Sequence, residues 1–482
     1  MKQGALTFLG IDVGTSSVKV LAFNREHRES VGVSYPPETS LYEHDADMVA
    51  QTVRLALRKL FAKGNVSPHQ VAGIGLSGHG PSVLFINSSG DPLTPITTWQ
   101  DRRALKEAEL LREIRPGFEK DATSMEAKLF WTYRHHPELF EPGVTALAPK
   151  AYVCLVLCGK STIDLSTAST IDFYDRNTGK WDTGAAGFPL HVMPKVYKSW
   201  QEVGRTGTDF SRACGLPDSI PIFPGGIDAF CEAVGGGGFV EGVVVEGSGT
   251  STCLTRSVAI HRSSSLHVVP GSSLQIETLS ATGASYKWFG SCFYNLDLNK
   301  LSQQINPAKP VPVLFLPYLA GERSPIWDEK ARGLFIGMDL ETSAVDMLQA
   351  LFQGVAFAIR QNLESMTEGE NVQAVQAVGG SNRNDRWLQI KANVCGVPFD
   401  RMEEQDASAY GAAIVAAYGS GTYSMEQLAA LTKVEKRFEP DLSVKAEYDK
   451  LFSSYVGLYP NVRETYWKLF REVDAKTNVD IL

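Results

Sequence analysis

Apolar residues alternate with small and polar ones over positions 6–23, and the alternation breaks at the turn Gly14–Ser16. A second apolar run over positions 243–255 breaks in the same way at Gly249–Ser251. Period-two alternation on both sides of a glycine-containing turn is typical of a β-hairpin. The pattern therefore predicts two hairpins about half the chain apart, and both turns carry a Gly-Thr-Ser core.

Further strands and helices are predicted in the first half. Positions 47–63 have the spacing of an amphipathic helix, and positions 71–77 have the character of a buried strand. Positions 162–172 are rich in serine and threonine and predict a loop with a short strand. The apolar face of the helix is expected to contain Val49, Val53, Leu55, Leu57, Leu60 and Phe61.

The second half repeats this plan. Positions 344–366 predict a long helix, positions 375–378 a strand, and positions 385–394 another helix. Small residues over positions 410–418 predict a helix suited to close packing against another helix. The last 60 residues look mainly helical and carry no chemical motif.

Repeated strand and helix units in both halves predict an α/β protein with two domains and a cleft between them. A run of glycines at positions 235–238 interrupts the chain just before the second hairpin. We therefore place the boundary near 236–242, which gives an N-terminal domain over 1–240 and a C-terminal domain over 241–482.

Composition narrows the function classes. The 482 residues have a hydrophobic share of 43% and a net charge of −8, which allows sizeable cores and offers no basic field for nucleic acid. The seven cysteines form no CxxC pair, and the nine histidines lack zinc-ligand spacing. Neither a signal-like opening segment nor a run of 18 apolar residues is present. We therefore expect a cytoplasmic protein with no membrane or nucleic-acid partner.

Both Gly-Thr-Ser turns suit phosphate oxygens, because hydroxyls and exposed turn amides can donate to them. Asp12, at the end of the first strand, is a candidate ligand for Mg²⁺, which prefers carboxylate, water and phosphate oxygens. Asp228 follows Gly225–Ile227 and leads into a helix, so it is a candidate general base for a substrate hydroxyl. Turn capping for Asp12 and helix capping for Asp228 are the competing interpretations.

A third candidate phosphate or nucleoside site is the segment Gly379–Asn382, between a strand and a helix. Paired glycines are also common in ordinary strand-to-helix turns. Neither a GxGxxG fingerprint nor a GxxxxGK[ST] loop occurs. A Rossmann dehydrogenase and a P-loop ATPase are therefore disfavoured.

The site for the substrate that accepts the phosphate is predicted from three residues, Trp99, Asp101 and His79. An aromatic face next to a carboxylate and two guanidinium groups suits a polyol. A helix start capped by Asp101, with Trp99 in the core, explains the same residues. His79 lies between two glycines and is either a substrate contact or a structural residue.

The chain resembles the FGGY family of carbohydrate kinases, in the actin, hexokinase and heat-shock ATPase superfamily. The likeness runs from Phe8 to about Gly419, and its motifs follow the order of the family. They are Asp12–Ser16, Trp99-x-Asp101-x-Arg103, Lys128-Leu129-x-Trp131, Gly226-x-Asp228, Gly249–Ser251, Ala320–Asp328, Arg332–Met338 and Gly379–Ser381.

The resemblance implies two ribonuclease H-like (actin-like ATPase) domains with an active-site cleft between them. It implies a kinase that uses ATP and Mg²⁺, with Asp12 organising the metal ion and Asp228 acting as general base. The ATP phosphates would lie near Gly14, Thr15, Ser16, Gly249 and Thr250, and the nucleoside near Gly379, Gly380 and Asn382. The sugar would face His79, Trp99, Asp101 and Asp228.

Length and motif wording are closest to xylulokinase-like members, so a ketopentose such as xylulose is the first expectation. Ser77–Pro81 departs from the glutamine-methionine-histidine run usual in that group. Ribulose, glycerol, fuculose, rhamnulose or a tetritol are alternatives for the substrate. A non-catalytic nucleotide or sugar sensor and a hydrolase of acyl phosphate or polyphosphate are alternatives for the class. A homodimer is compatible with the resemblance.

Overall fold

The computed structural model describes residues 6–477, apart from positions 116, 119, 240, 264, 294 and 295. The chain divides into two compact units. The first unit comprises the described residues of 1–235, 258–274 and 406–432, and the second comprises those of 236–257, 275–405 and 433–482. Two segments from the predicted C-terminal domain thus pack with the first unit.

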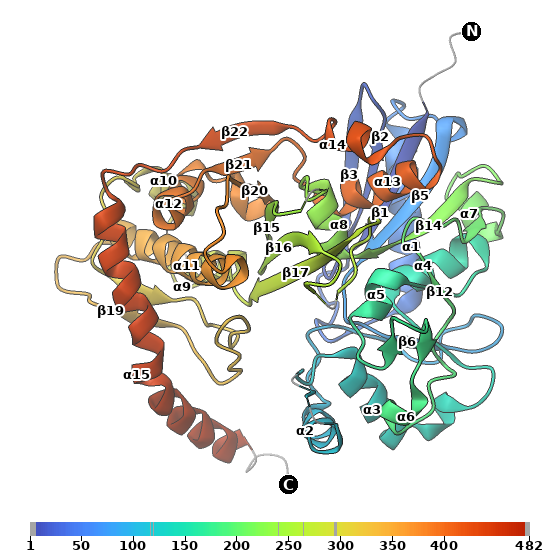
Figure 1. Ribbon diagram of the computed structural model, residues 1–482, viewed down its shortest axis with the longest axis horizontal. Helices are drawn as coiled ribbons and strands as arrows, with labels where there is room; N and C mark the ends of the chain where they lie inside the picture. Colours follow the sequence, from blue (N-terminus) through green and yellow to red (C-terminus); the bar gives the residue numbers. More distant parts are fainter. Residues whose placement is uncertain are drawn as a thin grey trace. The chain divides into compact units, whose positions relative to one another are not determined.

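The first unit contains a mixed six-stranded sheet in which β1, β5 and β14 run parallel (Figure 1). β2 pairs antiparallel with both β1 and β3, and β13 pairs antiparallel with β14. In spatial order the strands are β3 (Arg28–Ser34), β2 (Ser17–Phe23), β1 (Thr7–Val13), β5 (Val71–Gly78), β14 (Pro221–Ile227) and β13 (Gly204–Arg205).

The second unit has a six-stranded sheet with the same arrangement around its central hairpin. β15 pairs antiparallel with β16 and parallel with β20, as β1 does with β2 and β5. The order is β17 (Ser272–Leu279), β16 (Thr252–Ala259), β15 (Val244–Ser248), β20 (Val375–Val378), β21 (Phe399–Met402) and β22 (Val434–Phe438). The predicted α/β class and the duplicated hairpins are confirmed.

The helices divide between the two units. In the first unit they are α1 (Ala46–Ala62), α2 (Leu105–Ile114), α3 (Met125–His135), α4 (Pro149–Cys158), α5 (Leu165–Ser169), α6 (Thr183–Ala186), α7 (Asp209–Ala213), α8 (Asp228–Gly235), α13 (Ala407–Gly419) and α14 (Met425–Ala429). In the second unit they are α9 (Gly283–Cys292), α10 (Leu298–Gln303), α11 (Ala344–Thr367), α12 (Asp385–Cys395) and α15 (Lys445–Thr477).

Short strands pair outside the two large sheets. They are β4 (Glu43–His44) with β7 (Ile96–Thr97), β6 (Leu84–Ile86) with β8 (Thr145–Leu147), β9 (Ile163–Asp164) with β12 (Val196–Tyr197), β10 (Tyr174–Asp175) with β11 (Lys180–Trp181), and β18 (Leu314–Leu316) with β19 (Leu334–Ile336). α5 lies where the sequence predicts a loop, because Asp164 caps it by accepting from the amide of Thr167 at 2.9 Å.

The amphipathic helix α1 is confirmed, with one error in its apolar face. Val49, Val53, Leu57 and Leu60 are buried at three- and four-residue spacing, whereas Leu55 is 46% exposed. Residues at this spacing share one helix face, and position 55 falls outside it.

Side chains of β1 alternate between two differently covered faces. Leu9, Ile11 and Val13 join the core that includes α1 and α4. The opposite face meets α13, where a Cβ on Gly10 would come within 1.7 Å of the carbonyl oxygen of Ala409. α13 also packs closely on α8, so the predicted close packing of this small-residue helix is confirmed. Asp12 follows Gly10 on the α13 face because strand side chains alternate.

Candidate active site

Three parallel strands of the first unit end in one row. Val13 of β1 pairs in register with Gly78 of β5, and Gly78 pairs with Ile227 of β14. The next residues along the chain are Gly14, His79 and Asp228, so three predicted positions leave the sheet at the same carboxyl edge. Ligands of open α/β sheets commonly bind outside this edge.

Asp12 is one row further into the sheet, and its side chain is 8% exposed. Its Oδ1 accepts a hydrogen bond from the Ser77 hydroxyl at 2.8 Å. Burial raises the pKa of Asp12, and the Ser77 hydrogen bond and the positive charge of Lys19 act against that rise. Lys19 is opposite Asp12 in the β1–β2 ladder, but its ammonium group bonds Asp406 at 2.7 Å.

The first turn is closed by the Gly14 amide, which donates to the carbonyl of Ser17 at 3.0 Å. Two aromatic side chains support it. The Tyr35 hydroxyl donates to the Gly14 carbonyl at 3.1 Å, and the Trp99 indole N–H donates to Thr15 Oγ1 at 2.9 Å. Tyr35 thus supports the turn backbone, and Trp99 contacts a side chain of the turn.

Asp228 begins α8 immediately after an irregularity in β14. Gly225 has φ +58°, and a Cβ there would come within 1.8 Å of the carbonyl oxygen of Leu76. Glycine is required where the backbone takes this left-handed conformation at so close an approach. The Asp228 side chain is half-buried and accepts from the amide of Ala229 at 2.8 Å. This bond goes to the next residue and differs from a capping bond, in which the side chain accepts from the second or third residue of the helix.

A buried ion pair supports the strand that leads to Asp228. The ammonium group of Lys150 bonds the carboxylate of Asp164 and donates to the Pro224 carbonyl at 3.2 Å. Lys150 is 3% exposed and Asp164 is fully buried. Neither role is predicted from the sequence. A lysine in the first turn of a helix resembles an ordinary surface residue, so no local signal could have found it.

His79 is 1% exposed, and burial lowers the pKa of its imidazole to about 3. Its Nδ1 lies 2.8 Å from the Ser82 hydroxyl, and its ring meets that of His44 edge-on, with centroids 5.4 Å apart. Its Nε2 is buried without a hydrogen-bond partner in the described part of the chain. A neutral imidazole whose second nitrogen makes no hydrogen bond can accept a hydrogen bond from a hydroxyl or donate one to it, depending on the tautomer.

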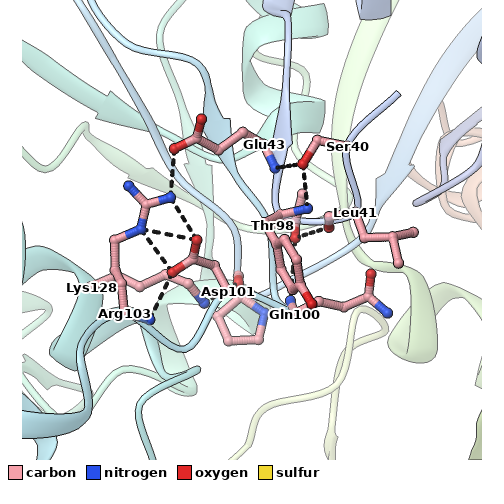
Figure 2. A network of polar contacts seen from close by, with 10 residues as sticks. Ser40, Leu41, Glu43, Thr98, Gln100, Asp101, Arg103 and Lys128 are labelled. Carbon is pink, nitrogen blue, oxygen red and sulfur yellow. Dashed lines mark hydrogen bonds and ion pairs between the residues drawn. The ribbon is translucent and has the colours of Figure 1, made fainter. Parts of the chain in front are cut away.

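Asp101 lies in a charged network with Arg103 and Glu43 (Figure 2). The Nε of Arg103 donates to both Asp101 carboxylate oxygens at 2.9 Å, and its Nη2 donates to Oδ2 at 2.7 Å. The guanidinium carbon of Arg103 also lies 5.2 Å from the ring centroid of Trp131. Asp101 is 5% exposed, and a carboxylate held this way keeps acceptor capacity for a further donor.

In the second unit, backbone amides at the start of α9 hold the other turn. Gly283 donates to the carbonyl of Gly249 at 3.1 Å, and Thr282 and Ala284 donate to that of Thr250 at 3.1 and 3.0 Å. A Cβ on Gly283 would come within 2.3 Å of the Gly249 oxygen. The sequence analysis missed Gly283 because its partner is 34 positions away.

A buried polar cluster connects this turn to the paired glycines. The ammonium group of Lys391 bonds Glu246 at 2.8 Å and Asn382 Oδ1 at 2.7 Å, and the Asn382 amide donates to Glu246 at 2.7 Å. All three side chains are fully buried. Gly379, with φ +91°, lets the chain pass close to Ser248, whose carbonyl oxygen would lie 2.6 Å from a Cβ. The Asn382 side chain thus points inward, and a nucleotide contact at this segment would come from its backbone.

The predicted site residues divide between the two units. The first unit contains Asp12, Gly14, Thr15, Ser16, His79, Trp99, Asp101 and Asp228, and the second contains Gly249, Thr250, Gly379, Gly380 and Asn382. Within the described residues, His, Cys, Asp and Glu side chains form no group of three or more that could hold a metal ion. One carboxylate beside a phosphate-type turn still fits Mg²⁺, which usually keeps several waters and binds one or two carboxylates with substrate phosphates. In the same part of the chain, no helix is long and apolar enough to cross a membrane.

Two α/β units with glycine-threonine hairpins, and carboxylates at a strand edge, are the features of a phosphotransferase. Comparison with known proteins identifies the family. The model of the FGGY family of carbohydrate kinases matches with its N-terminal domain over residues 7–235 and with its C-terminal domain over 247–420. The chain belongs to the FGGY family of carbohydrate kinases. It is therefore a sugar kinase that uses ATP, and kinases of this family generally use a divalent metal ion.

Full-length relatives support this assignment. A xylulose kinase of Bacillus subtilis is 28% identical over 96% of this chain and 99% of its own, and one of Staphylococcus epidermidis is 25% identical over 95% and 97%. The fold matches the crystal structure of a xylulose kinase from Lactobacillus acidophilus with a TM-score of 0.85, at 23% identity and over 96% and 99% of the two chains.

Proposed function

We propose that the protein transfers the γ-phosphate of ATP to a hydroxyl of a ketopentose, and that xylulose is the substrate. The similarity to xylulose kinases over nearly the whole chain supports this choice of sugar. Gluconokinase and glycerol kinase are among the relatives at 24% and 26% identity, so gluconate and glycerol are the first competitors to test.

The shared row of strand ends carries the assignment of roles in the first unit. Asp228 and His79 follow paired residues of adjacent strands, and Asp12 is one row behind in the next strand. In the proposed reaction, the Asp228 carboxylate accepts the proton of the sugar hydroxyl as its oxygen attacks the γ-phosphorus. The uncommitted His79 nitrogen, the Asp101 carboxylate and the Trp99 ring orient the sugar.

Asp12 would hold Mg²⁺ directly or through water, and the ion would neutralise phosphate charge. Gly14, Thr15 and Ser16 would contact the phosphates from the first unit, and Gly249 and Thr250 from the second. Gly379, Gly380 and the backbone at Asn382 would lie along the nucleoside. Lys150 with Asp164 would position the Asp228 strand without touching the substrate.

An ADP-release assay with xylulose, ribulose, gluconate, glycerol, fuculose and a tetritol tests the substrate. We expect ADP formation that depends on the sugar, with the highest kcat/KM for xylulose. Preference for another polyol would contradict xylulose as the substrate but not the kinase activity. Binding of ATP or sugar without formation of ADP would indicate a sensor.

Asp228→Asn tests the general base. It removes the proton acceptor but keeps the side chain's shape, so we expect turnover to fall by about 10²–10⁴-fold with nucleotide binding retained. Full sugar-kinase activity in this variant would show that another group takes the proton.

A further inference from the structure

The hydroxyl of Thr15 is oriented by an aromatic residue from the acceptor side of the first unit. Trp99 Nε1 lies 2.9 Å from Thr15 Oγ1. An indole nitrogen is only a donor, so the Thr15 oxygen accepts this bond. The hydrogen of the Thr15 hydroxyl must then point away from Trp99, and the hydroxyl is set as a donor to a further acceptor.

The turn backbone is held independently of this contact. The Gly14 amide closes the turn on Ser17, the Tyr35 amide donates to the Ser16 carbonyl at 3.0 Å, and the Tyr35 hydroxyl donates to Gly14. Loss of the indole donor should therefore leave the turn's path intact. What it should change is the direction of one hydroxyl hydrogen.

We propose that Trp99 is a positioning residue that couples the acceptor site to phosphate binding through the Thr15 hydroxyl. This rests on the proposed function, in which the Trp99 ring faces the sugar and Thr15 faces the phosphates. A sugar that stacks on the ring fixes the indole, the indole N–H fixes the Thr15 oxygen, and the Thr15 hydrogen is presented to a phosphate oxygen. Correct acceptor binding thus improves phosphate alignment on the same side of the site.

Trp99→Phe separates the two roles of this residue, because it keeps an aromatic face and removes the donor. The substitution is made in three backgrounds: wild type, Thr15→Ser, which keeps the hydroxyl, and Thr15→Val, which replaces it with a methyl group of similar size. We expect kcat at saturating sugar to fall about three- to tenfold in the threonine and serine backgrounds, the range for one hydrogen bond. In the valine background, Trp99→Phe should change kcat less than about twofold.

The affinity of each of these variants for a non-hydrolysable ATP analogue is also measured, with and without saturating sugar. This measurement needs no turnover. We expect sugar to strengthen analogue binding in the wild type and in Thr15→Ser, and to do so less in every chain that carries Trp99→Phe or Thr15→Val. Trp181→Phe, in the short strand β11, is the matched control for losing an indole, and it should leave both measurements unchanged.

Equal effects of Trp99→Phe in the threonine and valine backgrounds would overturn the coupling, because the indole would then act without the Thr15 hydroxyl. Thermal unfolding of each variant identifies any that fail to fold, and a Trp99→Phe chain that fails is replaced by Trp99→Leu, which also lacks a donor. A wild-type chain inactive on every polyol would overturn the proposed function as well. Additivity in an active enzyme overturns only the coupling.

Discussion

The two glycine-threonine turns end equivalent strands of similar sheets, but different groups hold them in place. In the first turn, the side chains of Tyr35 and Trp99 donate to Gly14 and Thr15, in addition to the main-chain bonds of the turn. The second depends on main-chain amides of α9, which donate to Gly249 and Thr250. The same backbone plan thus has added aromatic side-chain donors at one turn and amide donors from a neighbouring helix start at the other.

The nearby carboxylates differ in the same way. Asp12 lies two positions before the first turn glycine and hydrogen-bonds neutral Ser77, while Lys19 bonds Asp406. Glu246 lies three positions before the second turn glycine and bonds the fully buried Lys391. The first arrangement leaves a carboxylate suited to an added cation, whereas the second neutralises its carboxylate within the protein.

Replacing each carboxylate by its amide should give the largest difference between Asp12 and Glu246. Asp12→Asn should lower kcat by at least about a hundredfold, since a metal ion's stabilisation of phosphate charge is worth several kcal/mol. It should leave the free energy of unfolding unchanged or raise it, because the raised pKa of this buried carboxyl means that its charged form is disfavoured in the folded protein. Glu246→Gln should instead lower that free energy by about 3–5 kcal/mol, because Lys391 keeps a buried charge without its partner. Urea unfolding and steady-state kinetics measure both.

The paired substitution Glu246→Leu with Lys391→Met is the control for the second arrangement. A buried ion pair can often be replaced by apolar residues at little cost in stability. We expect the double variant to unfold closer to the wild type than Glu246→Gln does. Loss of stability in Asp12→Asn as large as in Glu246→Gln would contradict the distinction between the two carboxylates.

Glu322, a buried carboxyl of the second unit, should make the stability of the protein depend on pH. Its Oε1 accepts from the amides of Ser280 and Arg323, both at 2.8 Å, and burial raises the pKa of its carboxyl to about 7. Between about pH 4.5 and 7 the folded protein binds this proton and the unfolded chain does not. The free energy of unfolding should therefore fall as the pH rises through this window, and this contribution should be level above it.

Glu322→Gln should remove this contribution, which is on the order of 3 kcal/mol. Urea unfolding at pH 5 and pH 8 measures it in the variant and in the wild type. The wild type should lose more stability than the variant between the two pH values. An identical loss in both chains would mean that Glu322 is charged in the folded protein throughout this range.

Local patterns were sufficient for the hairpins, the carboxyl-edge strands and α1, because hydrophobic periodicity is set by neighbouring residues. Leu55 is apolar but does not follow the three- and four-residue spacing of the buried face, so its side chain is exposed. Asp12 and Asp228 were identified as candidates because each ends an apolar segment next to glycine, and their roles stay predictions.

The supporting residues could not be predicted in this way. Lys391 and Glu246 are 145 positions apart, and their charges compensate each other only after the sheet and α12 have formed. Gly283 resembles any small residue near a helix start until the Gly249 carbonyl is placed against it. The Asn382 side chain, expected near the nucleoside, belongs to the same buried cluster. Long-range packing decides such roles, and a single sequence does not contain it as a local pattern.

The smallest effect is expected from removing one hydroxyl donor at each turn. Tyr35 and Ser381 both donate to the carbonyl of the turn glycine at 3.1 Å, in the first and second unit respectively. The Gly249 carbonyl also accepts from the Gly283 amide, and the Ser381 contact is exposed, so water can replace that hydroxyl. Tyr35→Phe should therefore lower kcat about three- to tenfold, and Ser381→Ala less than about twofold.

Kinetics at saturating sugar, with ATP varied, measure both substitutions, and thermal unfolding controls for general destabilisation. Tyr35 is 6% exposed, so water cannot readily replace its hydroxyl as a donor to the Gly14 carbonyl in the Tyr35→Phe variant. The effect should appear mainly in kcat, because the turn must hold the phosphates in line during transfer. If Ser381→Ala proved as damaging as Tyr35→Phe, the second turn would depend on its side-chain donor as much as the first, and the contrast between the two turns would fail.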